Sequence, residues 1–371
     1  MDLASLSKLA PLSVAVVLGT RPEVVKLAGL IRLLGPGCRL IHTGQHYDES
    51  MSKVFLDEFE LERPHVSLAV GGGSRARQIS DALLALDGHF SESRPGVVVV
   101  QGDTNSTVAG ALAANCNAIP LVHIEAGMRS YDLRMPEEHN RVVADHLATV
   151  CCAPTEGNAA NLKNEGIPAH RISITGHTVI EAVAEKLPTP AARADLLGRY
   201  GLQPSAFVMS TFHRAENVDD PVGLEQILRA LGKLSLPAVL PLHPRTRRRA
   251  EDYGLGSLLR SIITLAPLDY RTFLALCAES ALIVTDSGGV QVEATVYPRP
   301  LVVVRDSTEY PEVVGTFATL VPPSGDIVAA AEAWLERMPE AVEELSGLSN
   351  PYGDGSASMR CLEAVVRGFG P

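Results

Sequence analysis

Several ionisable side chains follow apolar, strand-like runs of the sequence. Asp103 and Glu125 each come at the end of such a run, and Glu137 opens the next helical segment. In open α/β sheets, ligands bind beyond the carboxyl ends of the strands. The three carboxylates are therefore candidates for proton transfer, and the side chain of Glu125 is expected at the rim of the sheet. Glu138 is expected to have a structural role at the helix start.

A histidine occupies the same kind of position later in the chain. His213 follows the run "FVMST", with Arg214 beside it. A lone histidine is more often structural, but one at a strand end next to an arginine is a candidate for acid–base chemistry. Asp103 has an alternative too, because it could cap the helix that follows it.

Two strand ends have the residues of an anion site. Ser287, Gly288 and Gly289 lead from a strand into a helix, so that backbone N–H groups could approach a phosphate. Arg21, after "LGT", adds a forked donor suited to phosphate. Glu293 is placed to accept from ribose hydroxyls. No strand leads into GxGxxG, so bound NAD is not supported.

Short apolar runs that alternate with helical patterns must position these residues. Their lack of strict polar alternation is typical of parallel strands buried on both faces, and the βαβ order predicts an α/β fold with doubly wound sheets. The expected strands are 14–18, 40–43, 97–101, 121–124, 172–174, 207–211, 238–242, 262–265, 282–285 and 301–304, and the clearest helices are 24–34, 78–89, 107–115 and 273–279.

Two Rossmann-like domains are expected. A break in the pattern around "KLPTP" separates residues 1–186 from residues 187–355, and a helix from about 356 to 371 is expected to pack back on the first domain. The acid–base residues then belong to the first domain and the phosphate-binding turn to the second.

Composition narrows the class of protein. The 371 residues carry a net charge of -11, which argues against non-specific nucleic-acid binding. The six cysteines form no CxxC pair, so no metal site is expected and most are interpreted as buried thiols. The longest apolar run near the N-terminus, "VAVVL", is too short for a signal peptide or membrane span. A cytoplasmic protein is expected.

Two Rossmann-like domains facing a cleft, with a diphosphate on one side and carboxylates on the other, suggest chemistry on a nucleotide sugar. Inversion at carbon 2 is one candidate. The proton on carbon 2 has no adjacent carbonyl to make it acidic, so its direct removal is implausible. Elimination of the diphosphate to a glycal, followed by its re-addition, inverts the centre with acid–base groups alone.

The chain closely resembles the non-hydrolysing UDP-N-acetylglucosamine 2-epimerases, which have the GT-B fold. Single motifs are weak, but together they run in family order across nearly the whole chain. They are "GTRPE" with Lys26, "TGQH", "GDT", "HIEAGMRS", "PEE.NR", "HRAENVDD", "TDSGG.Q.E", "RD.TE.PE" and "NPYGDG".

The resemblance implies roles for individual residues. Asp103, Glu125, Glu137 and His213 would form the catalytic set, without cofactor or metal. UDP would be bound by Arg21, Lys26, Ser287, Gly288, Gly289, Glu293 and Arg305, with Phe273 and Leu268 beside the uracil.

The resemblance also implies a homodimer with domain closure and, as in some bacterial members, a second UDP-N-acetylglucosamine as activator. Gln45, Arg77, Gln78 and His243 match that allosteric set, but Asp48 stands where those members have Gln. Tyr310 replaces the usual Arg in "RD.TE.PE".

Other functions stay open on the sequence. A GT-B glycosyltransferase shares the fold but needs an acceptor, and a hydrolysing epimerase would release N-acetylmannosamine and UDP. A sensor that binds without turnover would not need the intact acid set. A UDP-linked diacetamido uronic acid is an alternative substrate.

Overall fold

The computed structural model describes residues 10, 13–45 and 56–368. The chain folds into two compact units. Unit 1 comprises Met1–Ala182 with Tyr352–Pro371, and unit 2 comprises Val183–Pro351. The two crossings between units fall a few residues before the expected boundaries at 186 and 355.

Unit 1 is built on a seven-stranded parallel sheet, in the order β3-β2-β1-β4-β5-β6-β7. The central strands β1 and β4 are buried along their whole length, as their valine-rich sequences predict. The strands are β1 (Val14–Leu18), β2 (Cys38–His42), β3 (Val66–Ser67), β4 (Val97–Gln101), β5 (Leu121–Ile124), β6 (Val150–Ala153) and β7 (Ile172–Ile174).

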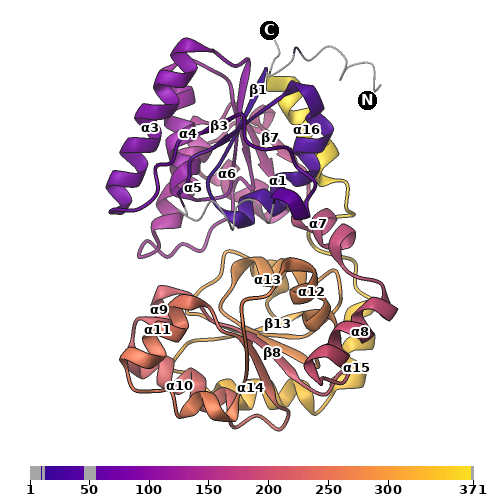
Figure 1. The fold of residues 1–371 in the computed structure, drawn as a ribbon. Coiled ribbons are helices and arrows are strands. Elements are labelled where there is room, and N and C mark those ends of the chain that lie inside the picture. The colour runs from indigo at the N-terminus through magenta and orange to yellow at the C-terminus, as the bar shows by residue number, and fades with distance from the viewer. Residues whose placement is uncertain (1–9, 11–12, 46–55, 369–371) are drawn as a thin grey trace. The chain divides into compact units, whose positions relative to one another are not determined.

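Helices cover both faces of this sheet. α3, α4 and α5 pack side by side on one face, and α1 and α16 lie together on the other, where α16 also contacts β5 and β6 (Figure 1). The helices are α1 (Arg21–Leu34), α3 (Arg75–Glu92), α4 (Asn105–Cys116), α5 (Pro136–Leu147), α6 (Glu156–Asn164), α7 (Val179–Lys186), whose last residues belong to unit 2, and α16 (Ala357–Gly368).

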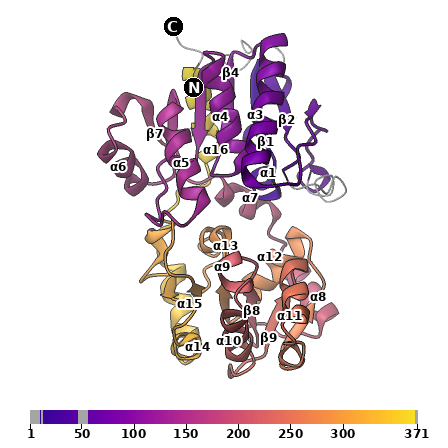
Figure 2. The same ribbon diagram turned by 90° about the vertical axis from the view of Figure 1, so that its left-hand side faces the viewer.

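Unit 2 repeats the design with a six-stranded parallel sheet, in the order β10-β9-β8-β11-β12-β13. α10 and α14 pack together on one face of it, and α12 and α13 lie on the other (Figures 1 and 2). The strands are β8 (Val208–Thr211), β9 (Ala238–Pro241), β10 (Ile263–Leu265), β11 (Leu282–Thr285), β12 (Leu301–Val304) and β13 (Ala318–Val321), and the helices are α8 (Pro190–Tyr200), α9 (Ala215–Val218), α10 (Pro221–Leu231), α11 (Pro244–Asp252), α12 (Tyr270–Glu279), α13 (Gly288–Glu293), α14 (Ile327–Leu335) and α15 (Met338–Ser346).

Two doubly wound parallel sheets confirm the predicted fold class. Every expected strand is present within two residues, while β3, β6 and β13 were not predicted. Five of the six cysteines are buried and only Cys116 is exposed, so their interpretation as buried thiols is confirmed for most of them.

Candidate active site

Glu125 lies directly after β5, but its side chain is not at the rim. Only 4% of the residue is exposed. Its backbone turns through the left-handed region, with φ at 64°, immediately after the strand. Its carboxylate meets Lys26 Nζ, 2.8 and 2.9 Å from the two oxygens, and the side-chain amide of Gln101. The expected rim position is therefore wrong, because these partners hold the carboxylate inside.

The partners of Glu125 decide its charge. Burial alone would raise the pKa of this carboxyl, but the Lys26 ammonium and His177 hold the pKa well below its ordinary value. His177 Nε2 lies 2.5 Å from Glu125 Oε1. Glu125 is thus a buried carboxylate that stays ionised at neutral pH.

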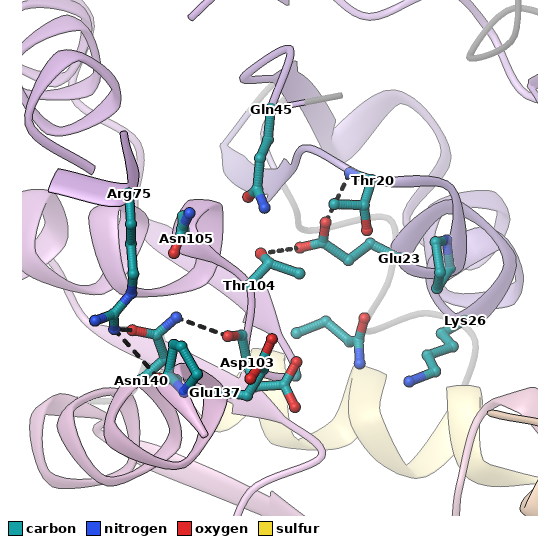
Figure 3. Close-up of a pocket in the computed structure, with 14 residues that line it drawn as sticks. Thr20, Glu23, Lys26, Gln45, Arg75, Asp103, Thr104, Asn105, Glu137 and Asn140 are labelled. Atoms are coloured by element: carbon teal, nitrogen blue, oxygen red, sulfur yellow. Dashed lines mark hydrogen bonds between the residues drawn. The ribbon is translucent and has the colours of Figure 1, made fainter. Parts of the chain in front are cut away.

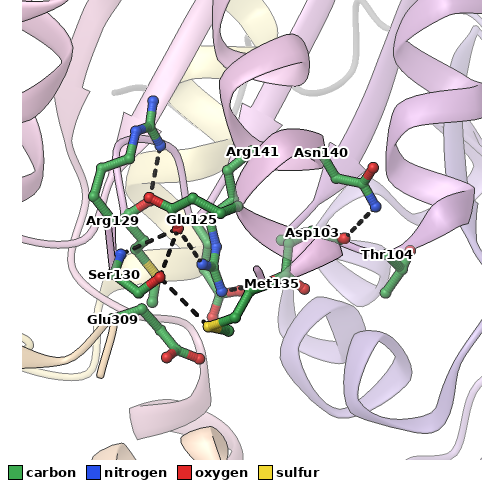
Figure 4. A network of polar contacts seen from close by, with 12 residues as sticks. Asp103, Thr104, Glu125, Arg129, Ser130, Met135, Asn140, Arg141 and Glu309 are labelled. Atoms are coloured by element: carbon green, nitrogen blue, oxygen red, sulfur yellow. Dashed lines mark hydrogen bonds and ion pairs between the residues drawn. The ribbon is translucent and has the colours of Figure 1, made fainter. Parts of the chain in front are cut away.

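Asp103 follows β4 and is positioned from α5. Gly102, with φ at 69°, makes the turn, and Asn140 donates to the Asp103 backbone carbonyl at 2.8 Å. Arg141 contacts the Asp103 carboxylate and also pairs with Glu138 at 2.9 Å (Figure 4). The N-cap of α4 is Thr104, so the capping role considered for Asp103 is wrong and its carboxylate is held by a cation instead.

Glu138 has the structural role expected of it. Its carboxylate is buried and accepts from Ser130 N–H and O–H and from Tyr131 N–H, at 3.0 to 3.1 Å, besides pairing with Arg141. It fixes the loop before α5 and orients the arginine that holds Asp103.

A pocket of about 410 Å³ opens at this edge of the unit 1 sheet. It brings together Asp103, Glu137 and Lys26 from the expected site with Gln45 from the expected allosteric set (Figure 3). Lys26 and Gln101, which bind Glu125, both line it. The full lining is Thr20, Pro22, Glu23, Lys26, Gln45, Arg75, Gln101, Gly102, Asp103, Thr104, Asn105, Pro136, Glu137 and Asn140.

Glu23 is a pocket residue that the sequence analysis missed. Its buried carboxylate accepts from Gly19 N–H at 3.0 Å, Thr20 N–H at 2.8 Å and the Thr104 hydroxyl at 3.0 Å. Burial raises its pKa to about 7, although these donors oppose the shift. The spacing Thr20-x-x-Glu23 is that of a capping box, a signal that could have identified it.

Two partners of Glu125 were also missed. Gln101 is the last residue of β4, and His177 follows β7 by three residues. Both lie at strand ends, so the rule that selected Asp103 and Glu125 would have selected them. His177 was hard to recognise as a strand-end residue, because β6 was not predicted and β7 is only three residues long.

In unit 2, His213 pairs with a buried aspartate. Its Nδ1 lies 3.2 Å from Asp286 Oδ1, and Asp286 also accepts from the backbone N–H groups of His213 and Arg214 and from the Asn217 side chain. Burial would raise the pKa of Asp286, but His213 and the other donors lower it. The His213 side chain is 44% exposed, whereas Asp286 is buried. A buried carboxylate therefore contacts an imidazole that solvent can reach.

The expected UDP-binding residues of unit 2 lie at the ends of neighbouring strands. Ser287 is the N-cap of α13, after β11, and Arg305 follows β12, buried and paired with Glu309 at 2.7 Å. Glu293 ends α13 and accepts from the Tyr270 hydroxyl at 3.0 Å. The remaining members are Gly288 and Gly289 in the first turn of α13, Phe273 in α12 and Leu268 before it, the last two half-buried.

Tyr310, which departs from the resemblance, packs beside the glycine turn. A Cβ added at Gly288 would lie 2.9 Å from both Tyr310 Cε2 and Glu309 Oε1. The buried tyrosine therefore forms part of the wall behind Ser287 and Gly288.

The expected allosteric residues fall into both units. Gln45 accepts from the Ser106 N–H and hydroxyl, and Gln78 accepts from Asn105, a pocket residue. Arg77 is exposed and pairs with Asp81 at 2.8 Å. In unit 2, the ring centroids of His243 and His213 are 5.9 Å apart. Arg21 opens α1 but is not among the lining residues, and Asp48 is outside the described residues.

Two kinds of feature are absent from the described residues. No cluster of three or more His, Cys, Asp or Glu side chains there could hold a metal ion. No helix in the same part of the chain is long and apolar enough to span a membrane.

The fold and the strand-end carboxylates define an α/β protein of the GT-B type with an acidic pocket in its first Rossmann-like unit. The sequence model of the family described as UDP-N-acetylglucosamine 2-epimerase matches residues 36–366. The chain belongs to this family.

Individual relatives match along nearly their whole length. The UDP-N-acetylglucosamine 2-epimerase of Methanocaldococcus jannaschii is 35% identical, over 96% of this chain and 100% of its own. The UDP-2,3-diacetamido-2,3-dideoxy-D-glucuronate 2-epimerase of Pseudomonas aeruginosa is also 35% identical, with the same coverage. The crystal structure of UDP-GlcNAc 2-epimerase from Neisseria meningitidis bound to UDP-GlcNAc superposes with a TM-score of 0.85, at 32% identity, and covers 95% of this chain and 99% of that one.

Proposed function

We propose that this enzyme interconverts UDP-N-acetylglucosamine and UDP-N-acetylmannosamine without hydrolysing them. The observation that carries the proposal is the Lys26–Glu125 ion pair beside a pocket lined by Asp103 and Glu137. Proton transfers and the departure of a diphosphate require acid–base groups and no bound cofactor. Carboxylates in and beside a pocket are suited to such a reaction.

The reaction proceeds by elimination and re-addition. A base removes the proton from carbon 2, the C–H electrons form the C1–C2 double bond, and the C1–O bond breaks to release UDP. UDP then adds back to carbon 1 of the 2-acetamidoglucal while an acid protonates carbon 2 from the other face. The acid–base set is Asp103, Glu125, Glu137 and His213.

The surroundings of the three carboxylates suggest two different roles. A carboxylate whose pKa is far below its ordinary value is a weak base, so Glu125 is suited to stabilise positive charge and orient Lys26. Asp103 and Glu137 line the pocket itself and are better placed to exchange a proton with the sugar.

The leaving diphosphate needs cations and N–H donors as its charge grows. We assign its binding to Arg21, Lys26 and Arg305 with the turn Ser287–Gly289. Glu293 would bind the ribose, and Phe273 and Leu268 the uracil. We assign a second, activating UDP-N-acetylglucosamine to Gln45, Arg77, Gln78 and His243, and a homodimer as the working assembly.

A second substrate is supported by one comparison. The Pseudomonas aeruginosa relative, as similar in sequence as the archaeal one, acts by its name on UDP-2,3-diacetamido-2,3-dideoxy-D-glucuronate. The same elimination chemistry would serve a UDP-linked diacetamido uronic acid.

The test is incubation of the pure protein with each UDP-sugar in deuterated water, without NAD or metal, followed by proton NMR. We expect UDP-N-acetylmannosamine with deuterium at carbon 2. Free N-acetylmannosamine with UDP would instead identify a hydrolysing enzyme. UDP binding without exchange of UDP-N-acetylglucosamine would favour the uronic-acid substrate or a transferase.

A further inference from the structure

His177 has surroundings that fix which of its nitrogens has the proton. It follows β7 through Gly176, whose φ of 81° makes the turn and where an added Cβ would lie 3.0 Å from Tyr352 O. The ring is fully buried. The Val179 N–H donates to Nδ1 at 3.2 Å, so Nδ1 is the acceptor and the hydrogen is on Nε2.

The Nε2 side of the ring faces Glu125. Nε2 lies 2.5 Å from Glu125 Oε1, within the reach of a hydrogen bond to the carboxylate. His177 in this tautomer is a hydrogen donor to Glu125 without the charge of an imidazolium. Among the described residues, Lys26 from α1 and the amide of Gln101 from β4 also contact the carboxylate.

The C-terminal segment of unit 1 holds the ring in place. The His177 N–H donates to Tyr352 O at 2.8 Å. The two aromatic rings meet edge to face, with centroids 5.9 Å apart and planes at 77°. Tyr352 belongs to the "NPYGDG" loop that leads into α16. This loop therefore holds the imidazole that contacts Glu125.

We propose that His177 is a positioning residue for the reaction, which donates from Nε2 to Glu125 and thereby fixes both the orientation and the ionised state of that carboxylate. The inference rests on the proposed function for its effect on turnover, but its effect on Glu125 is independent of any substrate. Lys26 contacts both oxygens as a point charge on a flexible stem and Gln101 contacts Oε2, so the imidazole is the directed donor to Oε1.

The tautomer can be tested in the unaltered protein. Long-range proton–nitrogen NMR spectra should show His177 with a protonated Nε2 and an unprotonated Nδ1. A proton on Nδ1 would overturn the proposal, and this measurement depends on no variant that has to fold.

The effect on Glu125 is tested by carbon NMR of its carboxyl, assigned by the loss of its signal in Glu125→Gln. In His177→Leu the carboxyl should titrate at higher pH than in the wild type, whereas His177→Gln, which keeps a side-chain N–H donor, should restore most of the difference. His89→Leu, at a half-buried histidine of the same unit, is the matched control. An unchanged titration in His177→Leu would refute the proposed role.

Turnover gives a separate readout. His177→Leu should lower kcat by about 10- to 100-fold with little change in KM, and His177→Gln should recover much of it. A purely structural role would lower the thermal midpoint in both variants without changing the pH profile of kcat/KM. If the wild type epimerised no UDP-sugar, the proposed function would fail while the two NMR experiments still decided the role of His177.

Discussion

His213 Nδ1 lies 3.2 Å from Asp286 Oδ1, and the same carboxylate accepts from the backbone N–H groups of His213 and Arg214. A fully buried aspartate thus fixes both the ring and the backbone of a histidine whose side chain is 44% exposed. With Nδ1 donating to the carboxylate, Nε2 is the acceptor nitrogen of the neutral ring. A carboxylate that orients the imidazole in this way is a recurring device of acid–base sites.

Asp286→Asn should therefore lower kcat by about 100-fold, because the amide can present its N–H to Nδ1 and stabilise the wrong tautomer. The measurement is steady-state epimerisation together with the thermal midpoint. Asp252→Asn, at an exposed position of unit 2, is the control and should change neither. A kcat within a factor of two of the wild type would show that this pair has no part in the reaction.

Arg141→Lys should loosen Asp103. The guanidinium contacts Asp103 with one nitrogen and Glu138 with the other, and a single ammonium cannot reproduce that fork. We expect kcat to fall by about 10- to 100-fold as the Asp103 carboxylate loses its fixed position. Arg134→Lys is the matched control, since Arg134 pairs with Asp132 but its side chain is 75% exposed. Equal turnover in the two variants would contradict the assignment.

The fold followed from the sequence where strands were long and strongly apolar. Val97–Gln101 and Val14–Leu18 were predicted with their observed bounds, because strands buried on both faces of a parallel sheet have nearly continuous apolar sequences. β6 was missed because "VCCA" has a single β-branched residue, and β3 because it is two residues long. Their places in the sheet come from pairing with neighbours, which local pattern does not encode.

The site was predicted only in part, for a similar reason. Position after a strand selected Asp103 and Glu125, but the left-handed backbone at Glu125 decides whether its carboxylate faces outward or inward. Glutamate rarely adopts that conformation, so nothing in the sequence signals it. Its contact with His177 joins the ends of β5 and β7, two strands that are not neighbours in the sheet.

Two adjacent glycines in α13 should respond differently to alanine. A Cβ at Gly288 would lie 2.9 Å from Glu309 Oε1 and Tyr310 Cε2, whereas one at Gly289 would meet no atom of the described residues within 4 Å outside its chain neighbours and its own helix backbone. Gly288→Ala should therefore lower the thermal midpoint and weaken UDP binding. Gly289→Ala should leave the thermal midpoint unchanged or slightly raised, because alanine favours the helix by about 1 kcal/mol.

The same pair tests the proposed diphosphate site. If UDP approaches the backbone of this turn, Gly289→Ala should weaken UDP binding, measured by calorimetry, without loss of stability. Gly256→Ala, at another glycine of unit 2 with open space around it, is the control and should leave UDP affinity unchanged. Undiminished affinity in Gly289→Ala would move the diphosphate away from this turn.

The buried Glu23 carboxyl should make the free energy of unfolding decrease as pH rises. Burial raises its pKa from 4.5 to about 7, so between these values the folded protein binds more protons than the unfolded chain. The contribution of Glu23 to the free energy of unfolding is fully present below pH 4.5. It is lost as pH rises through 7, by up to about 3 kcal/mol. Glu23→Gln stays neutral and should flatten this dependence, with thermal midpoints at pH 5 and pH 8 closer together than in the wild type. Glu92→Gln, at the exposed end of α3, should keep the wild-type difference. A wild-type difference retained in Glu23→Gln would mean that Glu23 is already ionised at pH 5, held so by the Gly19, Thr20 and Thr104 donors.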